Sequence, residues 1–250
     1  MKRSLLLVAF PFLALTAIAT ETTPNQLTPA EVKAGWKLLW DGKTSAGWRA
    51  YREPAFPAVG WQMKDGVLTV LDSSGGASSG PGGDIMTTEK FSDFELAVDF
   101  KISAGANSGI KYFVPASDET NKGAGIGFEF QVLDDERHPD AKMGAGGNRT
   151  VGSLYDLIPA ATNKKINPPG EWNSARVISR GAHVEHWLNG RKVLEYERFT
   201  PAFRERVAAS KYKSIAGFGE WTEGRILLQD HGAEVSFRNL KIRALRQPGK

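Results

Sequence analysis

Hydrophobic and polar residues alternate with a period of two in parts of the chain, a spacing typical of β-strands that bury one face. The clearest case is 94–102, in which the even positions carry the apolar side chains. Further apolar or alternating runs lie at 110–114, 128–133, 226–228 and 235–242. This pattern predicts a protein built mainly of β-sheet.

Two dipeptides between such runs indicate tight turns. Asp65-Gly66 separates 61–63 from 67–70, and Asn189-Gly190 lies inside a second predicted hairpin from 183 to 196. Asp-Gly and Asn-Gly tolerate the positive φ angles that two-residue hairpin turns require. We therefore expect two β-hairpins.

One segment is typical of a helix. Thr200 is a suitable N-cap, Pro201 suits the first helical position, and Phe203 and Val207 lie four residues apart. The number of strands, the spacing of the turns and this single short helix predict an all-β fold. We expect a jelly-roll sandwich of two antiparallel sheets.

The first nineteen residues have the form of a signal peptide. Lys2 and Arg3 precede the apolar run 5–15, and Ala17-Ile18-Ala19 forms an A-x-A cleavage site. The apolar run is short for a membrane span of about 20 residues. We expect cleavage after Ala19, a periplasmic or secreted protein, and no membrane anchor after processing.

The rest of the chain divides into a linker, one domain and a short tail. Residues 20–33 are rich in Thr, Pro and Asn and indicate a linker, 34–246 form the expected domain, and 247–250 form a tail. The composition, 41% hydrophobic and 24% charged, is that of a folded globular protein. We find no internal repeat.

Charge and cysteine content exclude several classes. Removal of Lys2 and Arg3 leaves 30 basic against 28 acidic residues, a net charge of +2, with no basic stripe for nucleic acid. There is no Cys, so disulfides and a thiol nucleophile are excluded. Walker A, dinucleotide-binding and H-E-x-x-H motifs are absent. His183 and His186 fall on opposite faces of a strand, so we interpret them as surface or packing residues.

The strand at 128–133 offers the first candidate site. Period two places Glu129 and Gln131 on one face and the phenylalanines on the other, and Asp134 and His138 follow the strand. A solvated strand face with a charged loop is the alternative interpretation.

A second candidate follows the apolar strand 226–228. Gln229 and His231 share a face, and a histidine near carboxylates is a candidate acid or base. The alternative is a turn, in which Asp230 caps the backbone and Gly232 takes a positive φ.

Polar groups near two other turns can bind a ligand hydroxyl. Asn107 precedes the strand at 110–114, and Tyr155 lies in Gly-Ser-Leu-Tyr-Asp at 152–156. The chain also has seven Trp, and aromatic faces can stack on sugars, but we expect Trp36, Trp40 and Trp61 in the core.

These motifs together resemble the 3-keto-disaccharide hydrolase family, formerly a domain of unknown function. The most specific run is Leu-Gln-Asp-His-Gly at 228–232, and Asp135 stands where the family often has Asn. The other matching stretches lie at 35–43, 93–96, 107–110, 129–134, 152–155, 171–173, 186–190 and 224–227. The resemblance covers nearly all of the mature chain and implies a concanavalin-A-like jelly roll, export and action on keto-sugars.

The implied substrate is a glycoside already oxidised at C3. A ketone at C3 acidifies the C2 hydrogen, so a base can remove it and the C1 substituent can leave by elimination. This route differs from that of two-carboxylate glycosidases. The catalytic candidates are Glu129, Asp134, His138 and His231, among which the base stays open, and Mn²⁺ or Ca²⁺ is a candidate cofactor. The substrate-binding candidates are Asn107, Gln131, Tyr155, Gln229 and Asp230. A non-catalytic carbohydrate-binding module is the alternative function.

Overall fold

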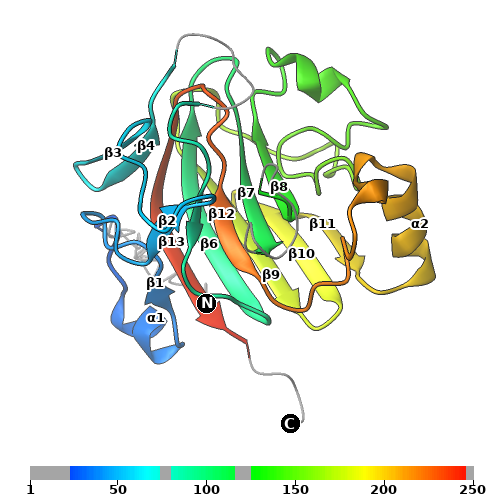
Figure 1. The fold of residues 1–250 in the computed structure, drawn as a ribbon, viewed down its shortest axis with the longest axis horizontal. Helices are drawn as coiled ribbons and strands as arrows, with labels where there is room; N and C mark the ends of the chain where they lie inside the picture. The colour runs from blue at the N-terminus through cyan, green and yellow to red at the C-terminus, as the bar shows by residue number, and fades with distance from the viewer. Residues whose placement is uncertain (1–22, 74–79, 116–124, 246–250) are drawn as a thin grey trace, which may run out of the picture.

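A computed structural model describes residues 23–73, 80–115 and 125–245. Two antiparallel sheets form the fold (Figure 1). The larger sheet has the strand order β11-β10-β9-β6-β13-β4-β3, with β1 also paired to β13, and the smaller has the order β2-β5-β12-β7-β8. This two-sheet sandwich confirms the fold class predicted from the sequence.

The strands are β1 Lys37–Leu38, β2 Trp48–Ala50, β3 Trp61–Lys64, β4 Val67–Val70, β5 Ile85–Thr87, β6 Phe94–Ile102, β7 Asn107–Val114, β8 Phe128–Leu133, β9 Asn173–Arg180, β10 His183–Leu188, β11 Arg191–Glu197, β12 Arg225–Leu228 and β13 Val235–Ala244. The helices are α1 Pro29–Lys33 and α2 Pro201–Ala209, with 3-10 turns η1 Pro139–Lys142 and η2 Lys211–Ser214.

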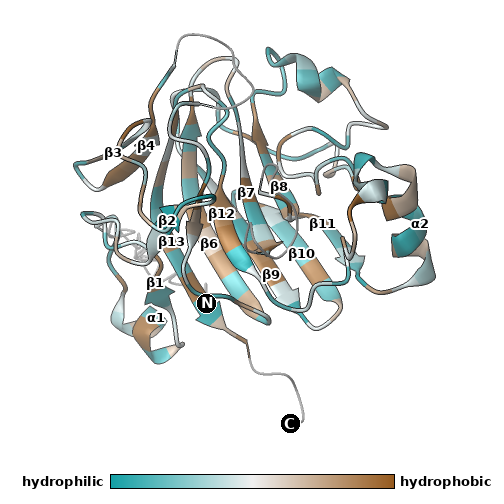
Figure 2. Cartoon of the chain, viewed as in Figure 1, coloured by the Kyte–Doolittle hydropathy of each residue, from teal (hydrophilic) through white to brown (hydrophobic). Residues whose placement is uncertain are grey.

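The core between the sheets follows the alternation in the sequence. In β6 the side chains of Phe94, Leu96 and Phe100 are at most 1% exposed. In β8, Phe128 and Phe130 belong to the same buried cluster. Teal and brown bands alternate along these strands (Figure 2). Full burial of one such side chain stabilises the fold by roughly 1.5–3 kcal/mol, so this pattern fixes which face of each strand turns inward.

Both predicted hairpins are present. Asp65 and Gly66 join β3 to β4 with φ of 51° and 73°, and Asn189 and Gly190 join β10 to β11 with φ of 48° and 76°. Positive φ at both central residues is the signature of a type I′ turn, whose twist matches that of the flanking strands.

The helix predicted at Thr200 is confirmed as α2, and the Thr200 hydroxyl accepts a hydrogen bond from the Phe203 N–H at 3.2 Å. A second helix, α1, is an addition to the single helix expected. It lies in the segment expected to be a linker, which instead is attached to the domain. The Asn25 N–H donates to Asn239 Oδ1 at 2.7 Å, and the Asn25 amide donates to the Gly66 carbonyl at 2.8 Å.

The expected signal peptide, 1–19, lies outside the described residues. Among the described residues, no helix has the length and apolar character needed to cross a membrane.

Strand β7 contains a bulge beside the polar face of the smaller sheet. Phe113 has a φ of 55°, and Tyr112 and Phe113 both lie in the core between the sheets. The pairing with β12 shifts register at this point. Beyond the bulge, Val114 belongs to a second apolar cluster with Tyr51, Met86 and Leu227, on the face of the sheet opposite the core. Bulges often redirect side chains next to functional sites.

Candidate active site

A pocket of about 130 Å³ lies on the face of the smaller sheet that is turned away from the core. We call it the Glu129 pocket. Side chains from β7 and β8, from the segment after β12 and from η2 surround it. Its lining residues are Asn107, Lys111, Gly125, Ile126, Gly127, Glu129, Gln131, Tyr155, Lys211, Tyr212, Gln229 and His231.

Strand pairing between β7 and β8 explains four of these lining residues. Glu129 is paired with Lys111, and Gln131 is paired with Gly109. The Gln131 amide donates to Asn107 Oδ1 at 3.1 Å. A Cβ at Gly109 would lie 2.3 Å from Glu129 Oε1, so glycine leaves the space that the carboxyl group fills. The predicted register, with Glu129 and Gln131 opposite the core, is confirmed.

The carboxyl group of Glu129 is buried next to two lysines. Its residue is 6% exposed, and Oε2 lies 3.9 Å from Lys111 Nζ. Burial raises the pKa of Glu129, and the Asp84 charge adds to the rise, while Lys111, Lys211 and His231 oppose it. A carboxylate with a raised pKa is a stronger base than an exposed one, which suits it to proton abstraction near neutral pH.

Lys211 approaches the pocket from η2, which follows α2. Its Nζ lies 4.1 Å from the centroid of the Tyr155 ring. Burial lowers the pKa of Lys211, and the Glu129 carboxylate opposes this change. The pocket therefore holds two ammonium groups, from Lys111 and Lys211, around one carboxyl group.

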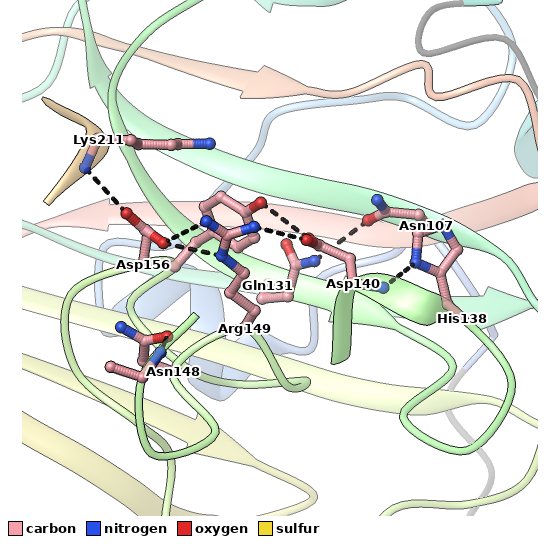
Figure 3. A network of polar contacts seen from close by, with 10 residues as sticks. Asn107, Gln131, His138, Asp140, Asn148, Arg149, Asp156 and Lys211 are labelled. Carbon is pink, nitrogen blue, oxygen red and sulfur yellow. Dashed lines mark hydrogen bonds and ion pairs between the residues drawn. The ribbon is translucent and has the colours of Figure 1, made fainter. Parts of the chain in front are cut away.

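A network of ion pairs holds Tyr155 and Lys211 in place (Figure 3). The Tyr155 hydroxyl donates to Asp140 Oδ2 at 2.8 Å. The Arg149 guanidinium bridges Asp140 at 2.8 Å and Asp156 at 2.7 Å. Asp156 Oδ2 accepts a hydrogen bond from the backbone N–H of Lys211 at 3.0 Å. Asp140, Arg149 and Asp156 do not line the pocket, so their role is to position Tyr155 and Lys211, which do.

His231 lines the pocket, and His138 lies behind it. The two rings are perpendicular, with centroids 6.4 Å apart. His138 caps η1, because its Nδ1 accepts the Asp140 N–H at 3.2 Å, which leaves the proton of the neutral ring on Nε2. Burial lowers the pKa of His138, and His231 adds to the decrease.

Asp134 lies outside the pocket lining and organises the loop after β8. Its Oδ2 accepts the Gly105 N–H at 2.8 Å and the Arg137 guanidinium at 3.1 Å. Its Oδ1 accepts the Glu136 N–H at 3.1 Å. Burial opposes the change, but these hydrogen bonds lower the pKa of Asp134. A carboxylate with these partners stabilises the loop, and the structure therefore gives no support to a catalytic role for Asp134.

A second pocket of about 380 Å³ adjoins the first. We call it the Asp84 pocket, and it shares Gly125 and Gln229 with the Glu129 pocket. Asp230 lines it, and its Oδ1 accepts the Gly232 N–H at 3.0 Å, with a φ of 83° at Gly232. The turn considered as the alternative is therefore present here. The complete lining is Ala50, Tyr51, Arg52, Glu53, Gly80, Pro81, Gly82, Gly83, Asp84, Gly125, Gln229 and Asp230.

The candidate metal ligands do not gather in this pocket. Among the described residues, three His, Asp or Glu ligand atoms come within 4.8 Å of one another at His183, Glu185 and Glu195, on β10 and β11 of the other sheet. Glu129, Asp134, His138 and His231 form no such group, so their placement does not fit a shared Mn²⁺ or Ca²⁺ site.

Four residues of the two pockets were not predicted from the sequence: Lys111, Lys211, Tyr212 and Asp84. Period two could have identified Lys111, because it lies on the same face of β7 as Asn107. Lys211 and Tyr212 follow a helix and had no periodic signal. The aromatic residues of the two pockets are tyrosines, and Trp36, expected in the core, is instead partly exposed near the Arg243 guanidinium.

The fold and the site define a class: a jelly-roll sandwich with a pocket of carboxyl, ammonium, amide and imidazole groups on one sheet. Residues 35–243 match the family model described as the 3-keto-alpha-glucoside-1,2-lyase-like domain. A 3-keto-disaccharide hydrolase from Bacteroides thetaiotaomicron is 38% identical over 230 residues, covering 84% of this chain and 79% of the relative. The chain belongs to this 3-keto-glycoside family.

Solved structures agree with this assignment. A putative glycosyl hydrolase from Parabacteroides distasonis is 31% identical with a TM-score of 0.78, and the match covers 90% of this chain and 100% of that one. A second putative glycosyl hydrolase from the same organism is 28% identical with a TM-score of 0.61, covering 84% and 99%.

Proposed function

We propose that this protein cleaves the glycosidic bond of 3-keto-glycosides or 3-keto-disaccharides by α-proton abstraction and elimination. The observation that supports this proposal most is the buried Glu129 carboxyl, 3.9 Å from Lys111 Nζ in a pocket that Lys211 and His231 also line. The family and the name of the Bacteroides relative support the same substrate class.

Glu129 is the base in this proposal. Its carboxylate removes the C2 hydrogen, which the neighbouring C3 ketone acidifies. Burial raises the pKa of Glu129 and so brings its basicity closer to that required for this step. Of the four candidate bases, Glu129 and His231 line the pocket, and His231 is assigned to substrate binding and proton transfer beside it.

The two lysines stabilise the intermediate. Removal of the C2 hydrogen places negative charge on the C3 oxygen, and fixed positive charges in a site that excludes water stabilise such an oxyanion strongly. Lys111 Nζ is held by the Gly125 carbonyl at 3.0 Å, so its position is set before substrate binds. Asn107, Gln131 and Gln229 supply amide groups for sugar hydroxyls, and Tyr155 supplies a ring face.

The intermediate then loses its C1 substituent, which gives an unsaturated keto-sugar. If water adds to this product in the site, the net reaction is hydrolysis, and if the product leaves first, the reaction is that of a lyase. Analysis of the released sugar by mass spectrometry distinguishes the two. The leader at 1–19 supports export to the periplasm or beyond, which N-terminal analysis of the exported protein tests.

Dependence on Mn²⁺ or Ca²⁺ remains a separate proposal, based on the oxygen and imidazole groups in the sequence. No step above uses a metal. Assays of chelator-treated protein, with and without added Mn²⁺ or Ca²⁺, test it directly.

The test of function compares 3-keto-trehalose or 3-keto-sucrose with the parent disaccharide. We expect release of a monosaccharide from the keto forms alone, because the parent lacks an acidic C2 hydrogen. Glu129→Gln should remove this activity while Glu185→Gln, on the other sheet, keeps it. Binding of keto-sugars without cleavage would instead favour the carbohydrate-binding module.

A further inference from the structure

The two pockets adjoin each other on the smaller sheet. Gly125 and Gln229 line both of them, with Glu129 on one side and Asp84 on the other. A substrate with two parts joined at one oxygen matches this shape. If the keto-sugar occupies the pocket with the base and the lysines, the group attached to C1 extends into the Asp84 pocket.

Asp84 lies at the junction. Its Oδ1 accepts the Asp230 N–H at 3.0 Å, which fixes the carboxyl group. Its Oδ2 lies 3.5 Å from the position that a Cβ of Gly125 would occupy. Since Gly125 borders both pockets, this second oxygen lies beside the boundary between them.

Asp84 and Glu129 are two buried carboxyl groups that both interact with Lys111. Burial raises the pKa of both carboxyl groups, and the Lys111 charge opposes the rise in both. The Asp84 charge also raises the pKa of Glu129, so ionisation of one carboxyl group opposes ionisation of the other. Two carboxyl groups under these conditions favour a state in which one is ionised and the other keeps its proton. Glu129, 3.9 Å from Lys111 Nζ, is the one we assign as ionised.

We propose that Asp84 protonates the leaving-group oxygen and that the Asp84 pocket receives the departing sugar or other hydroxylated group. This assignment rests on the proposed function and adds a catalytic residue to it. Glu53 and Asp230 also line that pocket, and Asp230 Oδ1 accepts the N–H of Gly232 at 3.0 Å. We assign the acid to Asp84 because its Oδ2 lies beside Gly125, which borders both pockets.

The step balances. The Glu129 carboxylate takes the C2 proton, and the C2–H electrons form the C2=C3 bond of the enediolate. These electrons then form C1=C2, the C3 ketone is restored, and the bond from C1 to oxygen breaks. The leaving oxygen takes the proton of Asp84. In hydrolysis, Asp84 takes a proton from water as its oxygen adds to C1, and Glu129 returns a proton to C2, so both groups are reset.

The test uses Asp84→Asn in the full chain with two substrates, a 3-keto-glucoside of a nitrophenol and one of a simple alcohol. A nitrophenol leaves without help from an acid, whereas an alcohol requires protonation. We expect kcat/KM for the alcohol glycoside to fall by about 10²–10⁴-fold and that for the nitrophenyl glycoside by less than about tenfold. The ratio is measured on one preparation, so partial unfolding cancels.

A second readout follows the base step alone. In D₂O, exchange of the C2 hydrogen of the alcohol glycoside should persist in Asp84→Asn and be lost in Glu129→Gln. Asp93→Asn is the matched control, because Asp93 Oδ1 also accepts a backbone N–H, from Gly181 at 2.6 Å, in the turn between β9 and β10 of the larger sheet.

Equal losses on both substrates, or loss of C2 exchange together with cleavage in Asp84→Asn, would overturn the role of Asp84 while the proposed function stands. Failure of the unmodified protein to cleave either keto-glycoside would overturn the proposed function and Asp84's role together. Should Asp84→Asn fail to fold, Asp84→Glu, which keeps an acid, must show a leaving-group ratio closer to that of the unmodified protein than Asp84→Ser.

Discussion

The carboxyl group of Glu129 and the ammonium group of Lys111 face each other at 3.9 Å on paired positions of two neighbouring strands. Both residues are almost fully buried, at 6% and 5% exposed. Taking two charges out of water costs several kcal/mol for each ion, and their attraction offsets this only in part. A pair held at such a cost, in a pocket with a further lysine and a histidine, is better explained by catalysis than by stability.

The space beside Glu129 provides one prediction. Gly109→Ala places a methyl group where the carboxyl now lies, within 2.3 Å of Oε1. The backbone of Gly109 permits alanine, so we expect a folded protein with a displaced base. A displacement of about 1 Å can lower the rate by about 10²-fold. Steady-state kinetics and circular dichroism on one sample check this, and unchanged kcat/KM would argue against Glu129 as the base.

His231→Ala should lower turnover far more than stability. His231 lines the pocket from the segment after β12 and is only partly buried. Loss of such a side chain typically costs under about 1 kcal/mol, whereas loss of a positioned acid or base costs about 10²–10⁴-fold in rate. His183→Ala, on β10 of the larger sheet, is the matched control. A lower melting temperature with unchanged turnover per folded molecule would remove His231 from the site.

The pH dependence should report on Glu129. Because burial raises the pKa of Glu129, activity that needs its carboxylate should fall as pH decreases through this raised value. That limb should lie above the ordinary Glu pKa of about 4.3. A limb at or below the ordinary value would contradict the assignment.

The raised pKa of Glu129 affects stability in the opposite direction to activity: activity falls at low pH, whereas this contribution to stability falls at high pH. Between the ordinary and the raised pKa, folded Glu129 holds a proton that the unfolded chain has lost. Its contribution to stability is therefore present at low pH and is lost as pH rises through the folded pKa. Urea unfolding across this range should show that the difference between the unmodified protein and Glu129→Gln changes with pH in this direction. A constant difference would count against the shift.

His186 should make the fold sensitive to acid. It lies in the core, where its Nδ1 donates to the Gly152 carbonyl at 2.9 Å and its Nε2 accepts from the Tyr112 hydroxyl at 2.7 Å. Burial lowers the pKa of His186 from 6.5 to about 4. The unfolded chain therefore takes up a proton first, and stability present above the ordinary pKa is lost as pH falls toward 4. The difference amounts to about 3 kcal/mol.

Urea unfolding of the unmodified protein and of His186→Gln, measured at several pH values between 7 and 4, checks this prediction. The variant should be less stable at neutral pH but should lose the His186 part of the slope. His183→Gln, at a partly exposed position of the same strand, is the comparison: the Glu197 hydrogen bond raises the pKa of His183, so its removal should make the loss of stability on acidification steeper. Identical slopes in the unmodified protein and His186→Gln would show that another group causes the acid sensitivity.

Local spacing alone determined much of the fold. The alternation in β6 and β8, the Asp65-Gly66 and Asn189-Gly190 turns and the Thr200 cap were all predicted correctly. Each depends on residues within a few positions of one another, where period and backbone preference act directly. The same rule placed Glu129 and Gln131 on one face, because a shift of one residue would have put the flanking phenylalanines in water.

Segments that lack a periodic signal were not predicted. Residues 23–33 resemble a linker in composition, yet the Asn25 N–H donates a hydrogen bond to Asn239, which lies near the other end of the sequence. Strand β9 alternates only partly and was missed, although it lies between β10 and β6 in the larger sheet. Contacts with distant parts of the chain decide the conformation of both segments, and such contacts leave no pattern in the local sequence.

The composition of the site depended on tertiary structure. Strand order β12-β7-β8 brings His231 beside Glu129, although they lie far apart in the sequence. The same packing adds Lys211 from a turn after α2 and leaves Asp134 outside, bound to its own loop. The sequence by itself determined which face of a strand carries a carboxyl group, because side-chain direction is local. Only the packing of distant segments decided which charges surround that carboxyl group, since Coulomb interactions and desolvation depend on distance in space.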